Sequence, residues 1–135
     1  MRVGEMKKET RDWLNMVEYD IKTANTMFKT GRYVYVIFMC HLAIEKALKA
    51  VVCEATNKVP PKTHDLIYLV KLGEVKLEVN LLDFVGIINN AGVVTRYPED
   101  LAKLVSNYPK NVAKKYLEKT AEVIRCVKQD SGLKR

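Results

Sequence analysis

The sequence predicts an all-α protein, an up-and-down bundle of four long helices plus one short helix. Apolar residues recur at alternating steps of three and four through most of the chain, which is the spacing of one face of an α-helix. Only four prolines and six glycines occur in 135 residues, and most of them lie where a helical pattern stops. With 48% hydrophobic residues, we expect residues 1–135 to form a single domain.

The first two predicted helices differ in how much of their circumference is apolar. The first runs from Thr10 to Phe28 with one apolar stripe, and Gly31 is a plausible left-handed cap after it. The second, about Arg32 to Asn57, is apolar on most sides. We therefore expect the second helix to be the central and most buried one.

The next segment contains the shortest predicted helix. Two prolines in KVPPK (58–62) remove backbone donors and favour extended geometry. Thr63 can cap a short helix from His64 to Leu72, which ends at Gly73. Residues 74–79 alternate polar and apolar, but the chain offers no second strand to pair with them, so we interpret them as a connector.

Two further long helices complete the predicted bundle. Asn80, followed three residues later by Asp83, is typical of a helix start, and the helical face then runs to a cap candidate at Gly92. The segment after Gly92 is predicted to be a loop that contains Arg96. The last helix opens near Pro109, a favourable residue in a first turn.

A column of ionisable residues interrupts the apolar second helix. His41, Glu45 and Lys49 follow one another at four-residue spacing, so they lie along one slowly slanting line. Because an exposed pair at this spacing contributes only a few tenths of a kcal/mol, we expect the column to face water, another subunit or a ligand. It is either an ion-paired strip or the edge of a groove for a nucleotide phosphate or an RNA backbone. A zinc site at His41 and Glu45 is only weakly indicated, because one other histidine exists and no cysteine has ligand spacing.

Five short motifs in this order resemble the HEPN domain, the higher eukaryotes and prokaryotes nucleotide-binding domain, over about residues 8–128. They are Tyr19-Asp20-Ile21-x-x-Ala24, Gly31-x-Tyr33, HLAIEKALKA (41–50), P-x-T-H-D-L (61–66) and Thr95-Arg96-Tyr97-Pro98. The resemblance implies a helical homodimer, often encoded beside a small nucleotidyltransferase as a two-component, toxin–antitoxin-like module. Some members are metal-independent ribonucleases, whereas others bind nucleotides or serve as non-catalytic partners.

The ribonuclease members carry an arginine, a spacer of four to six residues and then a histidine. After Arg96 the corresponding positions are Leu101, Ala102 and Lys103, so the motif is absent. We therefore predict a nucleotide- or nucleic-acid-binding protein that is the non-catalytic partner of a nucleotidyltransferase. One alternative is a ribonuclease that uses Arg96 with His41 or His64 as a relocated base. Another is a purely structural helical protein whose polar column sets the register of a dimer.

The candidate phosphate- or nucleotide-binding residues are Arg96, Tyr97, Lys49, His41, Glu45, His64 and Asp20. A guanidinium beside an aromatic ring can clamp a phosphate and stack a base. The alternative is that Tyr97 caps the end of the bundle while Arg96 pairs with Glu45 or Asp20. His64 can instead help to cap its turn, and Asp20 is either a partner for Lys49 or Arg96 or a solvated acid.

Composition bears on the cellular setting. The net charge is +7, and residues 103–135 hold nine Lys or Arg against three Asp or Glu. We interpret these basic residues as a solvated helix face; the alternative is a contact surface for an anionic partner. The three cysteines show no paired spacing, which favours a reducing, cytoplasmic location. The sequence predicts neither a signal peptide nor a membrane span. It also predicts no metal and no cofactor.

Overall fold

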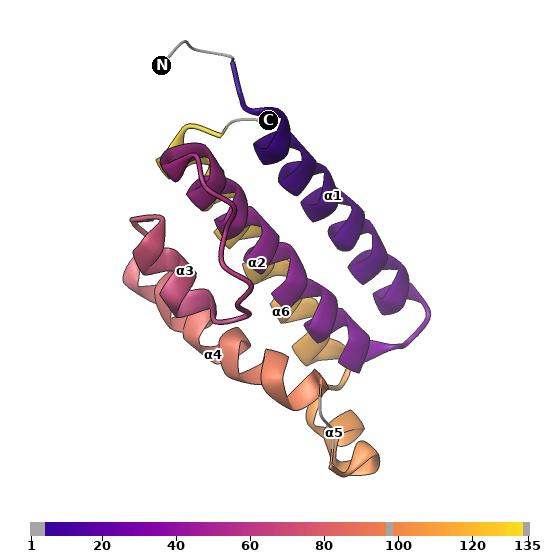
Figure 1. The fold of residues 1–135 in the computed structure, drawn as a ribbon. Coiled ribbons are helices and arrows are strands. Elements are labelled where there is room, and N and C mark those ends of the chain that lie inside the picture. Colours follow the sequence, from indigo (N-terminus) through magenta and orange to yellow (C-terminus); the bar gives the residue numbers. More distant parts are fainter. Residues whose placement is uncertain (1–4, 97–98, 134–135) are drawn as a thin grey trace.

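The computed structural model describes residues 5–96 and 99–133, and this part of the chain contains helices and no strand. The order of the helices, and their antiparallel packing, can be followed in Figure 1. Their bounds are α1 Lys8–Lys29, α2 Tyr33–Thr56, α3 Leu66–Leu72, α4 Val79–Arg96, α5 Leu101–Asn107 and α6 Lys110–Ser131. The predicted all-α bundle of four long helices is confirmed, and a second short helix, α5, is added to it.

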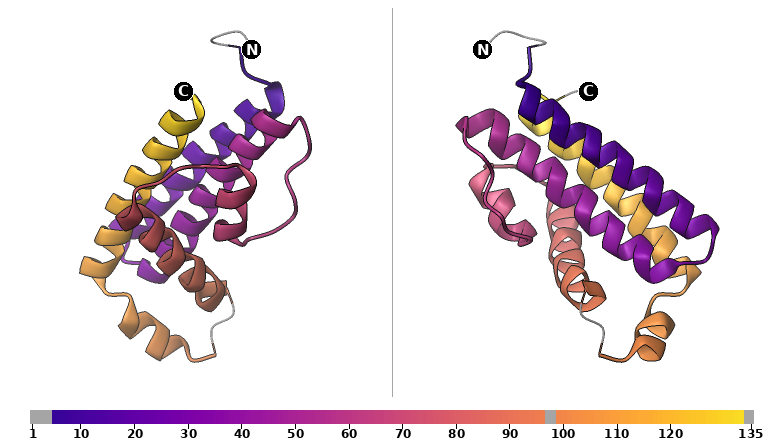
Figure 2. Two further views of the ribbon diagram at one scale, coloured as in Figure 1. Left: turned by 90° about the vertical axis from the view of Figure 1, so that its left-hand side faces the viewer. Right: turned by 45° about the vertical axis from the view of Figure 1, so that its right-hand side comes forward.

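Helix α2 is the centre of the bundle and packs against each of the other five helices. The views in Figure 2 place α1 and α6 along α2, while α3 and α4 cover another side of it. Fourteen of its residues are buried, among them Ile37, Ile44 and Leu48, which are wholly inaccessible to solvent. An apolar helix with few exposed positions is stable only inside such a core, which confirms the central position predicted from its composition.

Several predicted helix ends are confirmed. Gly31, just after α1, has a φ of +77°, the left-handed conformation that glycine adopts without strain. Asn57, which closes α2, is also left-handed, with a φ of 59°. Pro109 is the cap residue of α6, and residues 74–78 form the predicted connector.

The prediction for the fourth helix was wrong at both ends. It begins at Val79, so Asn80 lies inside the first turn, and it continues through Gly92 to Arg96. Arg96 is therefore the last residue of a helix and does not lie in a loop. Gly92 lies inside the helix, where the absence of a side chain leaves space for the ring of His41. A Cβ at this position would lie 2.7 Å from Cγ and Nε2 of His41 and closer still to Cδ2.

Two short helices also differ from expectation. Helix α3 begins at Leu66 rather than His64, since Asp65 caps it by accepting hydrogen bonds from the N–H groups of Ile67 and Tyr68. Thr63 instead accepts from the N–H of Asp65. Helix α5 was not predicted: it has seven residues, is capped by Asp100 and buries only Leu104, which leaves almost no periodic signal in the sequence.

Candidate functional site

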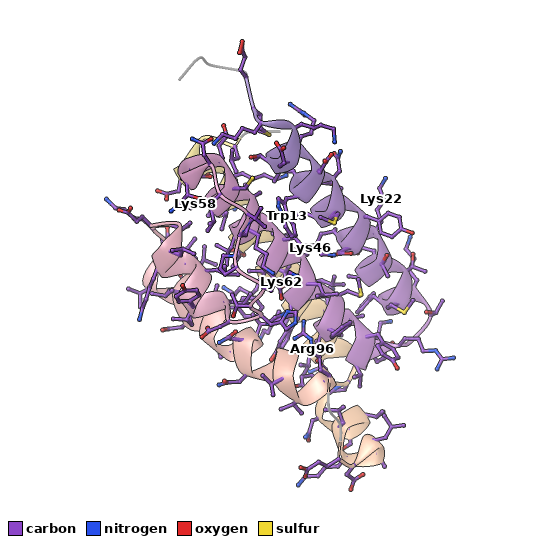
Figure 3. All side chains as sticks on the ribbon, in the orientation of Figure 1. Trp13, Lys22, Lys46, Lys58, Lys62 and Arg96 are labelled. Atoms are coloured by element: carbon purple, nitrogen blue, oxygen red, sulfur yellow. The ribbon has the colours of Figure 1, made fainter. Side chains whose placement is uncertain are left out.

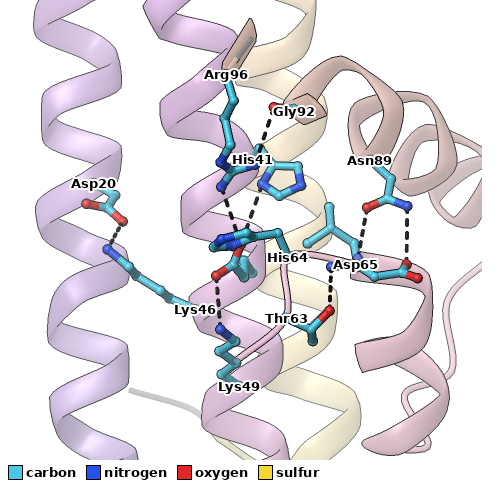
Figure 4. A network of polar contacts seen from close by, with 12 residues as sticks. Asp20, His41, Lys46, Lys49, Thr63, His64, Asp65, Asn89, Gly92 and Arg96 are labelled. Carbon is cyan, nitrogen blue, oxygen red and sulfur yellow. Dashed lines mark hydrogen bonds and ion pairs between the residues drawn. The ribbon is translucent and has the colours of Figure 1, made fainter. Parts of the chain in front are cut away.

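Glu45, in the middle of α2, is the centre of a buried polar cluster. His41, Glu45 and Lys49 expose only 1%, 4% and 6% of their surface. Lys49 Nζ donates a hydrogen bond of 3.0 Å to Glu45 Oε2, one helical turn away. Figure 4 shows how these side chains converge in front of α2. The spacing of four predicted from the sequence thus places all three groups in one cluster.

Two further segments bring nitrogen atoms to the other oxygen of Glu45. His64, from the connector between α2 and α3, places Nδ1 2.8 Å from Glu45 Oε1. Arg96, from the last turn of α4, places Nη2 3.7 Å from the same oxygen. Arg96 Nη1 also donates to the carbonyl of Gly92, and its guanidinium lies 5.1 Å from the ring centre of Phe38. The pairing of Arg96 with Glu45 is the one named in the alternative interpretation of the sequence.

These contacts correct one expectation from the sequence. The column was expected to face water, another subunit or a ligand, yet His64 and Arg96 from the chain itself cover it. The buried Glu45 carboxylate is tolerated because the ammonium of Lys49, the guanidinium of Arg96 and the His64 imidazole replace the water it loses. Only His64 remains well exposed, with 62% of its side chain accessible.

His41 is the innermost residue of the cluster. Its Nδ1 lies 3.7 Å from Glu45 Oε1, and its ring fills the space above Gly92. Burial, followed by the nearby guanidinium of Arg96, lowers the pKa of His41 to about 4. His41 is therefore neutral near pH 7, and it cannot touch a ligand directly because it is enclosed. Of the two alternatives for the column, the edge of a groove does not hold for His41, which lies behind the ion-paired cluster.

The charges in the cluster do not cancel. Lys49 and Arg96 carry two positive charges against one negative charge on Glu45, even with both histidines neutral. The Nη2 atom of Arg96 is buried and has no hydrogen-bond partner within the described part of the chain. The cluster therefore retains one excess positive charge, and Arg96 Nη2 is a buried donor that lies near Glu45 Oε1 without a hydrogen bond.

Asp20 does not take part in the cluster. Its Oδ2 lies 2.7 Å from Nζ of Lys46 on α2, rather than beside Lys49 or Arg96 as predicted. Lys46 follows Glu45 by one residue, which turns it about 100° around the helix, toward α1. The pair joins α1 to α2 at the edge of the polar cluster (Figure 4).

The connector holds His64 in place through its own hydrogen bonds. The N–H of Leu66 donates to Asn89 Oδ1 on α4, and Asn89 Nδ2 donates to Asp65 Oδ1. Thr63 accepts from the N–H of Asp65, so the residues on either side of His64 are fixed. This network sets the imidazole over Glu45 before any ligand is present.

Basic side chains come from several elements around the polar cluster. Figure 3 labels Lys22, Lys46, Lys58, Lys62 and Arg96, together with the single tryptophan, Trp13. Sequence reasoning missed Trp13 and Lys46 as site residues. Trp13 lies within the predicted first helix, and the Nζ of Lys49 lies 5.7 Å from the centre of its ring. Tyr97, also predicted for the site, lies outside the described residues.

Neither a metal centre nor a membrane span is found in the described residues. Within residues 5–96 and 99–133, no three His, Cys, Asp or Glu side chains lie close enough to share a metal ion. None of the helices described has the length and apolar character needed to span a bilayer.

The fold and the cluster define a class: a small helical bundle that carries a cation-rich polar cluster on its central helix. Residues 10–130 match the HEPN domain family, and the chain belongs to that family. The structure is similar to that of TT1696 from Thermus thermophilus, with a TM-score of 0.78 and 20% identity over 92% of this chain and 99% of that one. It is also similar to ST0689, an archaeal HEPN homologue, with a TM-score of 0.72 and 19% identity over 93% and 99% of the two chains. No curated protein matches the chain.

Proposed function

We propose that this HEPN protein binds the phosphate groups of a nucleotide or of single-stranded nucleic acid on the face that carries the Glu45 cluster. The observation that supports this most is the uncancelled positive charge at Lys49 and Arg96, which are largely buried and attract a phosphate electrostatically to the accessible groups in front of them. The guanidinium keeps its charge at any physiological pH.

Accessible groups at the rim supply the first contacts. The His64 imidazole is largely exposed beside Glu45, and Lys62 lies two residues before it on the connector. Lys46 keeps 21% of its side chain accessible while it pairs with Asp20. A phosphate that reaches this rim would meet positive charge on the connector, on α2 and at the end of α4, whereas one carboxylate, Glu45, stays turned inward.

Binding can be tested with fluorescein-labelled octamers of single-stranded RNA and with ATP, by anisotropy and calorimetry. Lys62→Gln should weaken binding and reduce the salt dependence of the affinity by about one unit of slope, because one phosphate contact is lost. Lys115→Gln is the matched control, since it removes the same charge from an exposed position on α6. Equal affinities for wild type and Lys62→Gln, or no binding of either ligand, would refute the proposal.

We propose a homodimer formed through the outer surface of α4. This surface exposes Ile87, Val93 and Val94, which are 56%, 61% and 49% accessible. Asp83 and Arg96 are the only charged residues of the 18 in α4. In a twofold contact a charged side chain can come close to the same side chain of the second copy, and like charges repel. A surface with few charges and several exposed apolar residues can therefore pack against a second copy of itself.

Light scattering tests this dimer. The wild type should have twice the 15.5 kDa mass of the chain, and Ile87→Glu should shift it to the single-chain mass. Tyr19→Glu on α1, which changes an exposed side chain elsewhere, should remain dimeric. A monomeric wild type, or a dimer that tolerates Ile87→Glu, would rule out this interface.

The two-component role and the cytoplasmic location remain predictions that family membership supports. We propose that the chain associates with a small nucleotidyltransferase as its non-catalytic partner. Tagged protein purified from its own cells should carry such an enzyme at a fixed molar ratio. Its absence from the purified material would count against the pairing but leave phosphate binding untouched.

A ribonuclease is the second candidate, favoured by one observation. Arg96 and His64 converge on Glu45 Oε1, so a cation for a developing phosphorane charge and an exposed imidazole lie in one cluster. If the chain cleaves RNA, cleavage should persist in chelator and fall sharply in both Arg96→Ala and His64→Ala. Cleavage that is unchanged in these variants would identify a contaminant.

A further inference from the structure

A pocket beside the polar cluster has no assigned role. It lies between the start of α1 and the end of α2, and its volume is about 390 Å³. Its lining residues are Lys7, Glu9, Trp13, Cys53, Asn57, Lys58, Val59 and Pro60. Pockets of this size hold small organic ligands, and they are usually formed by apolar and aromatic walls with a few polar groups that set orientation.

The walls of this pocket suit a flat aromatic ligand. Trp13 offers an indole for stacking, and Val59 and Pro60 add an apolar surface. Val59 is 87% exposed, so its side chain is accessible to a ligand that enters the pocket. Asn57 ends α2 in the left-handed conformation, and its amide carries both a donor and an acceptor. Aromatic stacking with one amide contact is how proteins commonly hold a nucleobase.

Charge decides which part of a nucleotide fits inside. Lys7 Nζ already donates to the carbonyls of Cys53 and Glu54 at the end of α2, so it is occupied in closing that helix. Glu9 adds a negative charge to the wall, which disfavours a phosphate within the pocket. Lys58 at the rim is exposed and can meet a phosphate outside it.

Lys49 joins this pocket to the polar cluster. Its Nζ lies 3.0 Å from Glu45 Oε2 and 5.7 Å from the centre of the Trp13 ring, so the ammonium lies between the cluster and the indole that lines the pocket. Trp13 and Lys58 line the same pocket, and Figure 3 labels both together with Lys46 and Arg96. A ligand with an aromatic base at Trp13 can therefore extend its phosphate, or the next phosphate of a strand, along the basic side chains.

We infer that the Trp13 pocket is a nucleobase subsite, in which the base stacks on the indole while its phosphate remains outside. The inference rests on the proposed phosphate-binding function and adds the chemical class that the protein selects: ligands with an unpaired base rather than polyanions in general. The base can belong to a free nucleotide or to a single-stranded RNA, and the chemistry of the subsite is the same for both.

The chain contains one tryptophan, so its fluorescence reports on the surroundings of Trp13, and ligands without a base control for a phosphate that binds near Lys49. The wild type would be titrated with AMP, adenosine, ribose 5-phosphate, an adenosine octamer and an abasic ribose-phosphate octamer. We expect quenching by the ligands that carry a base and none by the two that lack it. Quenching by AMP with weak response to the octamer indicates a free nucleotide, and the reverse indicates a strand; either supports the subsite.

Variants separate stacking from charge. Trp13→Leu should lower the octamer affinity about 5- to 100-fold, and Trp13→Phe should recover most of it, because stacking needs a ring. Because Trp13 also packs against the core, Val59→Asp provides a second variant at an exposed position, with Tyr19→Asp as its control. Val59→Asp should weaken the binding of ligands that carry a base, whereas Tyr19→Asp should leave their binding unchanged.

The outcomes distinguish this inference from the proposed function. If the octamer with bases and the abasic octamer bind equally and neither quenches Trp13, the subsite is refuted while phosphate binding stands. If neither octamer binds and adenosine quenches Trp13 with the same affinity as AMP, the subsite stands and the phosphate proposal fails. If no ligand binds or quenches, both are refuted.

Discussion

Replacing Gly92 by alanine tests how tightly the polar cluster is packed. The added Cβ would lie 2.7 Å from two atoms of the His41 ring and closer to a third, whereas carbon atoms rest about 3.5–4.0 Å apart. His41 is enclosed, so the ring or α4 has to move by about 1 Å. Such overpacking costs about 1–3 kcal/mol, against a gain of up to ~1 kcal/mol when alanine replaces glycine inside a helix.

Gly86→Ala is the matched control, because Gly86 lies in the same helix and a Cβ there meets nothing within 4 Å. It should gain about 0.5–1 kcal/mol of unfolding free energy, while Gly92→Ala should lose about 1–2 kcal/mol. Urea unfolding followed by circular dichroism measures both, with the protein concentration held constant because a dimer couples stability to concentration. The displaced His41 should also loosen Glu45 and weaken RNA binding in Gly92→Ala alone.

The reasoning can be checked further in a second background. In His41→Ala the ring is gone, so adding Gly92→Ala should cost less than it does in the wild type, with a coupling free energy of about 0.5–3 kcal/mol. If Gly92→Ala is as stable as Gly86→Ala in the wild-type background, the close contact between α2 and α4 does not exist as described.

Three other predictions concern His41, Cys40 and Asp65. Because the folded-state pKa of His41 is about 4 and its ordinary value is 6.5, its neutral form stabilises the fold fully above pH 6.5, and this contribution is lost as pH falls toward 4. Between those limits the wild type should lose up to about 3 kcal/mol more unfolding free energy than His41→Gln, and an equal loss in both would contradict it. Burial raises the pKa of the Cys40 thiol to about 12, so mass spectrometry should find it unmodified by iodoacetamide at pH 8 until urea unfolds the chain. Asp65→Ala should cost about 1 kcal/mol through the lost cap of α3, and it should weaken RNA binding more than Asp65→Asn does, because His64 loses its support.

The parts of the fold that sequence reasoning predicted correctly depend on local chemistry. Each long helix is recognisable because its own residues repeat every three or four positions, and Gly31 and Pro109 mark ends through their own backbone preferences. Gly92 was misinterpreted because its reason is tertiary: it is small so that a histidine from α2 fits against it, and nothing within α4 reveals that. Helix α5 was missed because it buries a single residue.

The candidate site divides in the same way. The positions of His41, Glu45 and Lys49 on one line follow from the geometry of α2 alone. Their partners do not, since His64 comes from 19 residues further along and Arg96 from the far end of another helix. For Asp20 the sequence left open a partner at Lys49 or Arg96 or a solvated position, whereas the packing of α1 against α2 pairs it with Lys46. Local spacing thus predicts which residues share a face, and only packing decides which residue from elsewhere meets them.

The contact of α2 with every other helix has a consequence for motion. Backbone amides in the middle of α2 can exchange with solvent only when the whole bundle opens, whereas those of α5, with one buried residue, can exchange through small local openings. We therefore expect the backbone amides of Glu45 and Lys49 to exchange among the slowest of the described residues. If an anion binds, we expect the connector that carries His64 to move, while α2 on the other side of the site stays in place.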